Sequence, residues 1–192
     1  MKGKKALEKR SEETRKKLLS AATKLFTLHG YHKTTVNDIA NEIGMTQGAF
    51  FHNFANKEEL LYAVVERLAR GFEEYRAVLG AANSTEALKE LSTMMMAHYN
   101  NSPEATICLA ALAAEFAGTG HPILQEILKA YDIFIDPFSD LLAGREGVDN
   151  PRASAIAFIG AFQGVAIQGL LRGGEISPDD LSNALAKLIG FK

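Results

Sequence analysis

Residues 34–57 read TTVNDIANEIGMTQGAFFHNFANK, and this stretch decides the fold. Its first part repeats apolar residues at the three- and four-residue spacing of one helix face, namely Val36, Ile39, Ala40 and Ile43. Thr35 is a residue type that caps helix N-termini, and Gly44 is one that ends helices. The pattern therefore predicts a short helix between Thr35 and Gly44.

A second short helix is predicted to open at Thr46 and to carry Phe50 and Phe51 inward. A helix-turn-helix requires a small residue where its helices cross and a glycine where its turn needs a positive φ angle. Ala40 and Gly44 meet these requirements in the right order. Because the second helix of such a motif contacts base edges in the major groove, the stretch predicts a DNA-binding module.

The rest of the chain also reads as helical, and alternating β patterns with hairpin turns are absent from the sequence. Residues 14–29 carry an amphipathic stripe that ends at Gly30, and a long helix is expected over 57–79. Further helices are expected over 84–99, 103–117, 122–143, 152–172 and 178–190. We therefore predict an all-α fold, with a three-helix N-terminal module in residues 1–56 and a larger helical body in residues 57–192.

Charge is distributed unevenly along the chain. Residues 1–60 hold 11 Lys and Arg against 7 Asp and Glu, whereas residues 61–192 hold 10 against 16. Such asymmetry is typical of a chain with one end that faces a polyanion, although chance clustering gives the same pattern. The single cysteine, Cys108, excludes an intramolecular disulfide and a cysteine-cluster metal site. The basic start of the chain is not followed by the apolar segment of a signal peptide, so we expect a cytoplasmic protein.

The stretch around residues 34–57 resembles the tetracycline-repressor (TetR) family of one-component regulators. The resemblance covers residues 14–62 and is carried by TTVNDIA at 34–40, IGM at 43–45, GAFFHNF at 48–54 and KEEL at 57–60. It implies a homodimer that binds double-stranded operator DNA and is most often a repressor released by a small molecule. It also implies that residues 57–192 form the ligand-binding and dimerisation domain, beside a DNA-binding domain in residues 1–56.

Six candidate DNA contacts lie in or beside the predicted module: Thr35, Thr46, Gln47, Phe51, His52 and Lys57. The Gln47 amide matches the N6 and N7 atoms of adenine, although a solvated surface glutamine would look the same. The two threonines and His52 suit phosphate oxygens, and Lys57 either does so from a helix N-terminus or pairs with a nearby glutamate. The family usually has Tyr, whose hydroxyl often bonds a phosphate, where this chain has Phe51. We expect Phe51 to extend the core, with packing against a sugar or a thymine methyl as the alternative.

Residues 153–171 carry no charge and meet the length test for a membrane span. Gln163, Gln168 and the glycines of the stretch weigh against that interpretation. Small residues also let two helices approach closely in helix bundles. In the resembled family the last two long helices of each subunit form a four-helix dimer interface. We therefore expect a dimer seam here and no contact with a membrane.

Five residues of the body are candidate ligand contacts: Met95, Tyr99, Glu115, Phe116 and Phe134. Most residues of these types form ordinary core, but methionine suits an adaptable apolar pocket. Glu115 lies in a run of Ala, Leu and Phe, where an unpaired carboxylate is unfavourable. It is therefore paired, exposed at a helix end, or in contact with a cationic ligand. The composition predicts a small apolar or amphipathic effector.

The sequence offers no catalytic constellation. The five histidines lack metal-ligand spacing on a common helix face, and the motifs of serine hydrolases, P-loop enzymes and dinucleotide-binding folds are absent. We therefore expect no catalytic residue, no metal and no cofactor. Two alternatives stay open. An architectural DNA-binding protein would bind DNA without a small-molecule response, and a small helical enzyme would show turnover.

Overall fold

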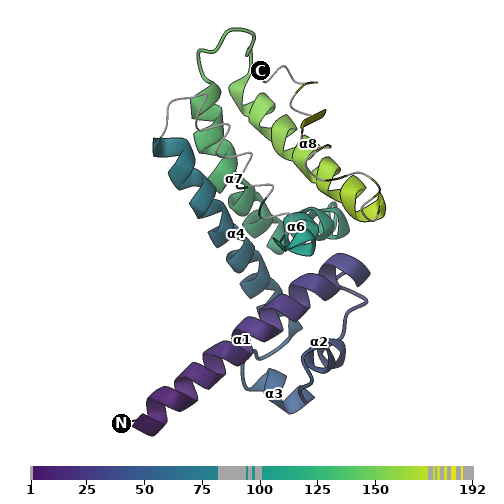
Figure 1. The fold of residues 1–192 in the computed structure, drawn as a ribbon. Coiled ribbons are helices and arrows are strands. Elements are labelled where there is room, and N and C mark those ends of the chain that lie inside the picture. Colours follow the sequence, from purple (N-terminus) through teal and green to yellow (C-terminus); the bar gives the residue numbers. More distant parts are fainter. Residues whose placement is uncertain are drawn as a thin grey trace.

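The computed structural model describes residues 2–81, 94, 97, 101–172, 175, 177, 180, 183, 184 and 187. Every regular element in these residues is a helix, which confirms the predicted all-α class. Figure 1 shows three N-terminal helices below a helical body, with one long helix running from the first group up into the body. The N-terminus lies at the far end of the lower group.

Helix α1 (Lys2–His29) buries the predicted stripe, including Leu18, Ala22 and Phe26. It begins at Lys2 and not near residue 14, so the predicted start was wrong. The extra turns contain no proline and are rich in Lys and Glu, which favour helices. An i,i+4 ion pair between Lys16 and Glu12 at 3.2 Å adds to this preference.

Helices α2 (Val36–Glu42) and α3 (Gln47–Phe51) form the predicted helix-turn-helix. Thr35 and Thr46 are their N-caps, as expected, and each side-chain oxygen accepts a hydrogen bond from a backbone amide of the first turn. Gly44 has a φ of 66°, which is the left-handed conformation that the turn requires. Ile39, Ala40 and Phe50 are fully buried where the helices meet.

The body consists of α4 (Lys57–Ala81), α6 (Pro103–Phe116), α7 (Ile123–Leu142) and α8 (Pro151–Arg172) in the described residues. These elements confirm four predicted helices to within two residues at each end. The helices expected over 84–99 and 178–190 lie outside the described residues, except for a few single positions. Helix α4 packs along α7, and α7 packs in turn against α8 (Figure 1).

One hydrophobic cluster continues from the N-terminal helices into the body, across residue 56. It joins Phe26 and Phe50 to Leu61, Leu112 and Phe116. Helix α1 packs against α6, and polar contacts reinforce this packing, because the Thr27 hydroxyl donates to the Glu104 carbonyl at 3.1 Å. A displacement of α6 is therefore felt directly by α1, since packed interiors transmit strain.

No helix in the described part of the chain has the length and apolar character needed to cross a membrane. This finding includes α8, which covers the uncharged stretch 153–171.

Candidate nucleic-acid interface

Helix α3 has one buried face and one exposed face. Phe50 is fully buried and packs on Phe54 with ring centroids 5.8 Å apart, while Gln47, Phe51 and His52 are exposed. Phe51 is 51% exposed, so the expectation that it extends the core was wrong. The turn after Gly44 directs Phe50 inward, and the next residue of a helix then points about 100° away. An exposed aromatic ring thus lies beside Gln47 on the outer face of α3.

The hydroxyl groups of Thr35 and Thr46 hold the two helices in place. Thr35 Oγ1 accepts from the Asp38 amide at 3.1 Å and lies 2.7 Å from Asp38 Oδ2, to which it donates its proton. The hydrogen bonds from the Thr35 side chain and backbone lower the pKa of the Asp38 carboxyl. Thr46 Oγ1 accepts from the Ala49 amide at 3.4 Å and keeps its proton for another acceptor. The phosphate contact predicted for Thr46 stays a prediction, whereas the Thr35 hydroxyl has no proton left for a phosphate oxygen.

Lys57 is half-buried at the start of α4. Its ammonium donates to the carbonyl oxygens of Tyr31 at 2.9 Å and Thr34 at 2.8 Å, and it lies 4.2 Å from the centre of the Tyr31 ring. Burial lowers the pKa of the Lys57 ammonium, and the Glu115 carboxylate opposes that shift. Its partners are carbonyl oxygens and not the glutamate considered from the sequence. One proton of the ammonium is left for the predicted phosphate contact.

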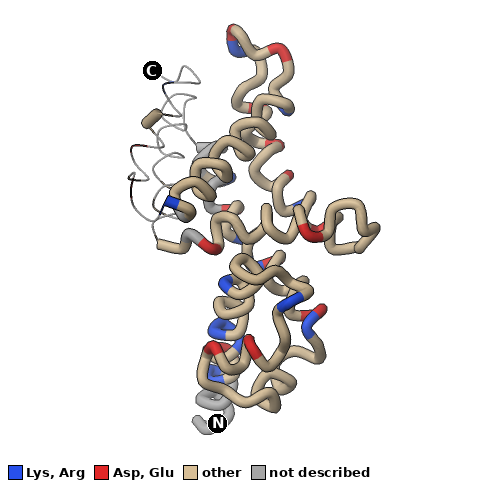
Figure 2. Tube along the Cα trace, turned by 90° about the vertical axis from the view of Figure 1, so that its right-hand side faces the viewer, with Lys and Arg blue, Asp and Glu red and all other residues tan. Residues whose placement is uncertain are grey.

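Arg15 has a positioning role that sequence reasoning missed. Its guanidinium donates to the Asn53 carbonyl at 2.8 Å and lies 4.1 Å from the centre of the Phe54 ring. These contacts fasten α1 to the residues that follow α3. Other basic residues of α1 are exposed and available to a DNA backbone, namely Lys9, Arg10, Lys16 and Lys17. Figure 2 shows Lys and Arg distributed along this helix.

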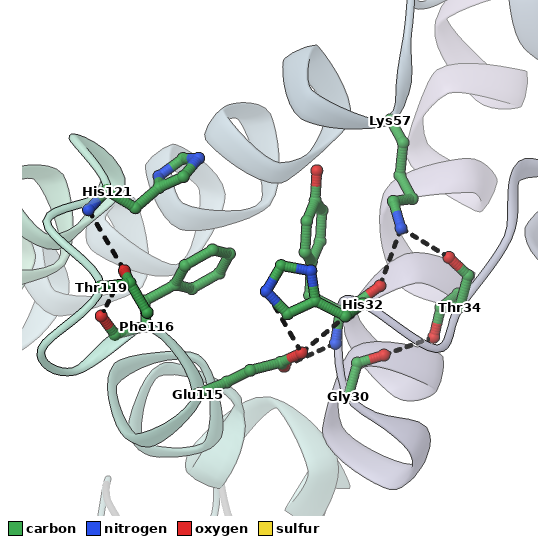
Figure 3. Close-up of polar contacts among 9 residues, drawn as sticks. Gly30, His32, Thr34, Lys57, Glu115, Phe116, Thr119 and His121 are labelled. Carbon is green, nitrogen blue, oxygen red and sulfur yellow. Dashed lines mark hydrogen bonds and ion pairs between the residues drawn. The ribbon is translucent and has the colours of Figure 1, made fainter.

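Glu115, predicted as a possible ligand contact, lies against the α1–α2 turn. Its Oε2 accepts from the Tyr31 amide at 2.6 Å and its Oε1 from the His32 amide at 2.8 Å (Figure 3). The carboxylate is thus paired, which is one of the alternatives left open from the sequence. With both oxygens engaged by backbone amides, the prediction of a cationic effector loses its basis.

The other predicted ligand contacts fall in different places. Phe116 is buried against Tyr31 and His121, in the cluster shared with the N-terminal helices. Phe134 is buried in a second cluster between α7 and α8, with Phe138. Met95 and Tyr99 lie outside the described residues. The structure therefore places the two described aromatic candidates in separate hydrophobic clusters.

A groove of about 510 Å³ lies between α4 and α7. Ala63, Ala69 and Ala130 are among its apolar lining residues, and charged side chains such as Arg15 and Glu66 also line it. None of the described ligand candidates contributes to it. Within the described residues no cluster of His, Cys, Asp or Glu could hold a metal ion.

Comparison with known proteins identifies the N-terminal module. The profile described as "Bacterial regulatory proteins, tetR family" matches residues 18–64. The chain is 28% identical to the HTH-type transcriptional regulator SrpR of Pseudomonas putida, over 94% of this chain and 84% of that protein. It is 39% identical to the HTH-type transcriptional repressor KstR2 of Mycobacterium tuberculosis, over 40% of each chain. Both relatives are transcriptional regulators and not enzymes.

Solved structures share the whole fold. AibR, solved in complex with isovaleryl coenzyme A and operator DNA, superposes with a TM-score of 0.73 and 22% identity, covering 91% of this chain and 97% of that one. The fatty acid degradation regulator FadR from Bacillus halodurans gives a TM-score of 0.70 and 20% identity, covering 91% and 93%. The agreement extends from the helix-turn-helix to the body. Residues 18–64 thus match the N-terminal domain of the tetR family of bacterial regulatory proteins, and the rest of the chain shares the fold of the solved structures.

Proposed function

We propose that this regulator is a repressor that reads its operator through the exposed face of α3 and is released by a small apolar or amphipathic ligand. The observation that carries the proposal is the orientation of α3. Its buried Phe50 fixes the helix on the core, while Gln47, Phe51 and His52 face solvent. A short helix fastened in this way fits the major groove with its N-terminal residues against the bases.

Each exposed residue has a distinct part in this proposal. Gln47 reads an adenine through its amide, and Phe51 packs against a sugar or a thymine methyl. Thr46, His52 and Lys57 contact phosphates, which position the protein without reading sequence. Thr35 acts as the cap of α2, because Asp38 takes its hydroxyl proton. The exposed cations of α1 supply further phosphate contacts and make binding depend on salt.

The proposed role of Gln47 can be tested in two steps. The purified protein first selects its preferred duplexes in vitro, and gel-shift titration then measures the affinity of Gln47→Ala for them. We expect the variant to lose about 1–3 kcal/mol on the preferred site and to relax base preference at one position per half-site. Gln125→Ala, an exposed glutamine on α7, is the matched control and should bind as the wild type does. Equal weakening of Gln47→Ala on all sequences would refute base reading by this residue.

The body supplies the dimer. The exposed face of α8 carries Ile156, Gly160, Gly164 and Ile167, and no atom of the residues that the structure describes lies within 4 Å of a Cβ built on either glycine. A face of small and apolar residues lets the same helix of a second subunit approach closely. Two α3 helices in one dimer would then read half-sites about one helical turn apart, or somewhat more.

Residues 57–192 are proposed to bind the effector, and residues 1–56 the DNA. Binding of isovaleryl coenzyme A, an amphipathic thioester, by AibR supports a ligand of this general class. A thermal-shift screen should include acyl-coenzyme A esters of several chain lengths and neutral apolar compounds. Hits should raise the melting temperature and release the selected duplex. If every hit leaves DNA affinity unchanged, the architectural alternative replaces inducible repression.

A further inference from the structure

The turn between α1 and α2 is held from two sides by the body (Figure 3). On one side the Glu115 carboxylate of α6 accepts from the amides of Tyr31 and His32. On the other side the Lys57 ammonium of α4 donates to the carbonyls of Tyr31 and Thr34. The turn at residues 30–35, which leads directly into the helix-turn-helix, is thus fixed to two different body helices.

The Glu115 contact is built into the backbone. Gly30 has a φ of 83°, and a Cβ placed on it would lie 3.2 Å from Glu115 Oε2. A left-handed residue followed by consecutive amides forms a concave anion-binding site, which the carboxylate occupies here. Hydrogen bonds to an ionised acceptor are roughly twice as strong as neutral ones, so this contact is directional and rigid.

The position of Glu115 couples movement of the end of α6 to the turn between α1 and α2. Glu115 is the penultimate residue of α6, and the next residue, Phe116, is buried against the Tyr31 ring at a centroid distance of 5.3 Å. Any shift of the C-terminal end of α6 must therefore move the turn or break both hydrogen bonds. The turn also determines where α2 begins, because it ends at Thr35, the N-cap of α2.

We propose that Glu115 is a positioning residue for DNA binding, which fixes the helix-turn-helix relative to α6 by holding the Tyr31 and His32 amides. Operator affinity is high when the carboxylate is engaged and falls when the end of α6 moves away. This inference rests on the operator binding proposed above.

The sign of the effect separates this role from simple electrostatics. Removal of a negative charge from a DNA-binding protein weakens repulsion of the phosphates and therefore leaves affinity unchanged or raises it. A broken clamp has the opposite effect. Glu115→Gln keeps the length of the side chain but replaces one acceptor oxygen with an NH₂ group that faces an amide proton, so it should lower affinity.

The experiment measures affinity of the full chain for the duplex selected by the wild type, at a temperature where circular dichroism shows every variant folded. Glu115→Gln and Glu115→Ala should bind about tenfold more weakly or worse, within the usual range of coupling between sites. Glu115→Asp keeps the charge but is one methylene too short, so it should resemble Glu115→Ala. Glu66→Gln, an exposed glutamate of α4 paired with Arg70 at 3.7 Å, is the control and should bind at least as well as the wild type.

Amide hydrogen exchange gives a second readout, which distinguishes a local release of the turn from a loss of stability of the whole protein. In Glu115→Ala the Tyr31 and His32 amides should exchange faster while the amides within α7 keep their protection. If the wild type binds the duplex and Glu115→Gln binds it equally well, the positioning role is wrong although the proposed function stands. If the wild type selects no duplex at all, the proposed function fails and takes the positioning role with it.

Discussion

Gly30 and Gly44 show what the fold requires of single residues. Gly30 must adopt a left-handed φ and must also leave room for the Glu115 carboxylate. Gly44 has the first requirement without the second, because among the described residues no atom lies within 4 Å of a Cβ built on it. Gly30 is therefore constrained both by its backbone conformation and by a neighbouring side chain, whereas Gly44 is constrained by its backbone conformation.

Substitution of these glycines should show that difference. Both Gly30→Ala and Gly44→Ala place a side chain at positive φ, which costs about 1–3 kcal/mol. Gly30→Ala additionally pushes on the Glu115 carboxylate, so its loss in free energy of unfolding should exceed that of Gly44→Ala. Urea denaturation of both variants measures the two losses, and equal values would mean that the carboxylate yields without strain.

Cys108 is fully buried, and its Sγ lies 3.7 Å from the Thr23 carbonyl oxygen. Burial raises the pKa of the Cys108 thiol from 9.0 to about 11. Since the thiolate is the reactive form, the folded protein should resist aromatic disulfide reagents at neutral pH and react only after unfolding. Rapid labelling of the native protein would show that α1 and α6 separate readily.

The pKa of Cys108 also predicts how stability depends on pH. Because the raised pKa favours the protonated thiol in the folded state, the free energy of unfolding should decline as pH rises from 9.0 towards 11.

At the scale of elements, the short helices of the DNA-binding module depend on their caps. Helix α2 has seven residues and a reciprocal capping box between Thr35 and Asp38. A helix of this length is not stable by propensity alone, so its cap and its buried face must hold it.

Thr35→Ala should therefore destabilise the protein by about 1 kcal/mol at neutral pH. The wild-type Asp38 carboxyl has a lowered pKa in the folded state, and its stabilising effect is present above its ordinary pKa and lost as pH falls through the lowered value. The difference between wild type and variant should accordingly shrink on acidification. Urea denaturation at neutral and at acidic pH measures it, with Thr119→Ala, outside the module, as control. A difference that is independent of pH would contradict the linkage to Asp38.

At the scale of the whole molecule, α8 presents a face of small and apolar residues that is exposed. Ile156 is 50% exposed and Leu171 75% exposed, and between them lie Gly160 and Gly164, which have no atom of the described residues within 4 Å of a Cβ built on them. Exposed apolar surface of this kind marks sites of association. The face is the proposed dimer seam.

Gly164→Leu should overpack that seam and yield monomer or aggregate, because inserted bulk in a close interface typically costs about 1–3 kcal/mol. Gln125→Leu adds similar bulk to an exposed position of α7 and should leave the dimer intact. Light scattering coupled to size-exclusion chromatography measures both masses. An intact dimer of Gly164→Leu would place the seam elsewhere.

The sequence by itself determined the all-α fold class, the two helices of the helix-turn-helix and the four described helices of the body, since the signals for these are local. Thr35 and Thr46 cap helices through partners three residues away, and the apolar stripes repeat within single helices. The likeness of residues 34–57 to the family's DNA-binding module has the same origin. A family profile of that region records helix caps and apolar spacings, which depend on residues that are close together in the sequence.

Only the tertiary structure decided the roles of Glu115, Lys57 and Phe51. Glu115 meets Tyr31 from 84 residues away, and Lys57 meets it from 26 residues away, so no local pattern connects them. Phe50 and Phe51 are adjacent and chemically identical, yet one is buried and the other is 51% exposed. That choice depends on the rotation of α3 about its own axis. The rotation is set by packing against α1 and α2, which brings together side chains that the sequence keeps apart.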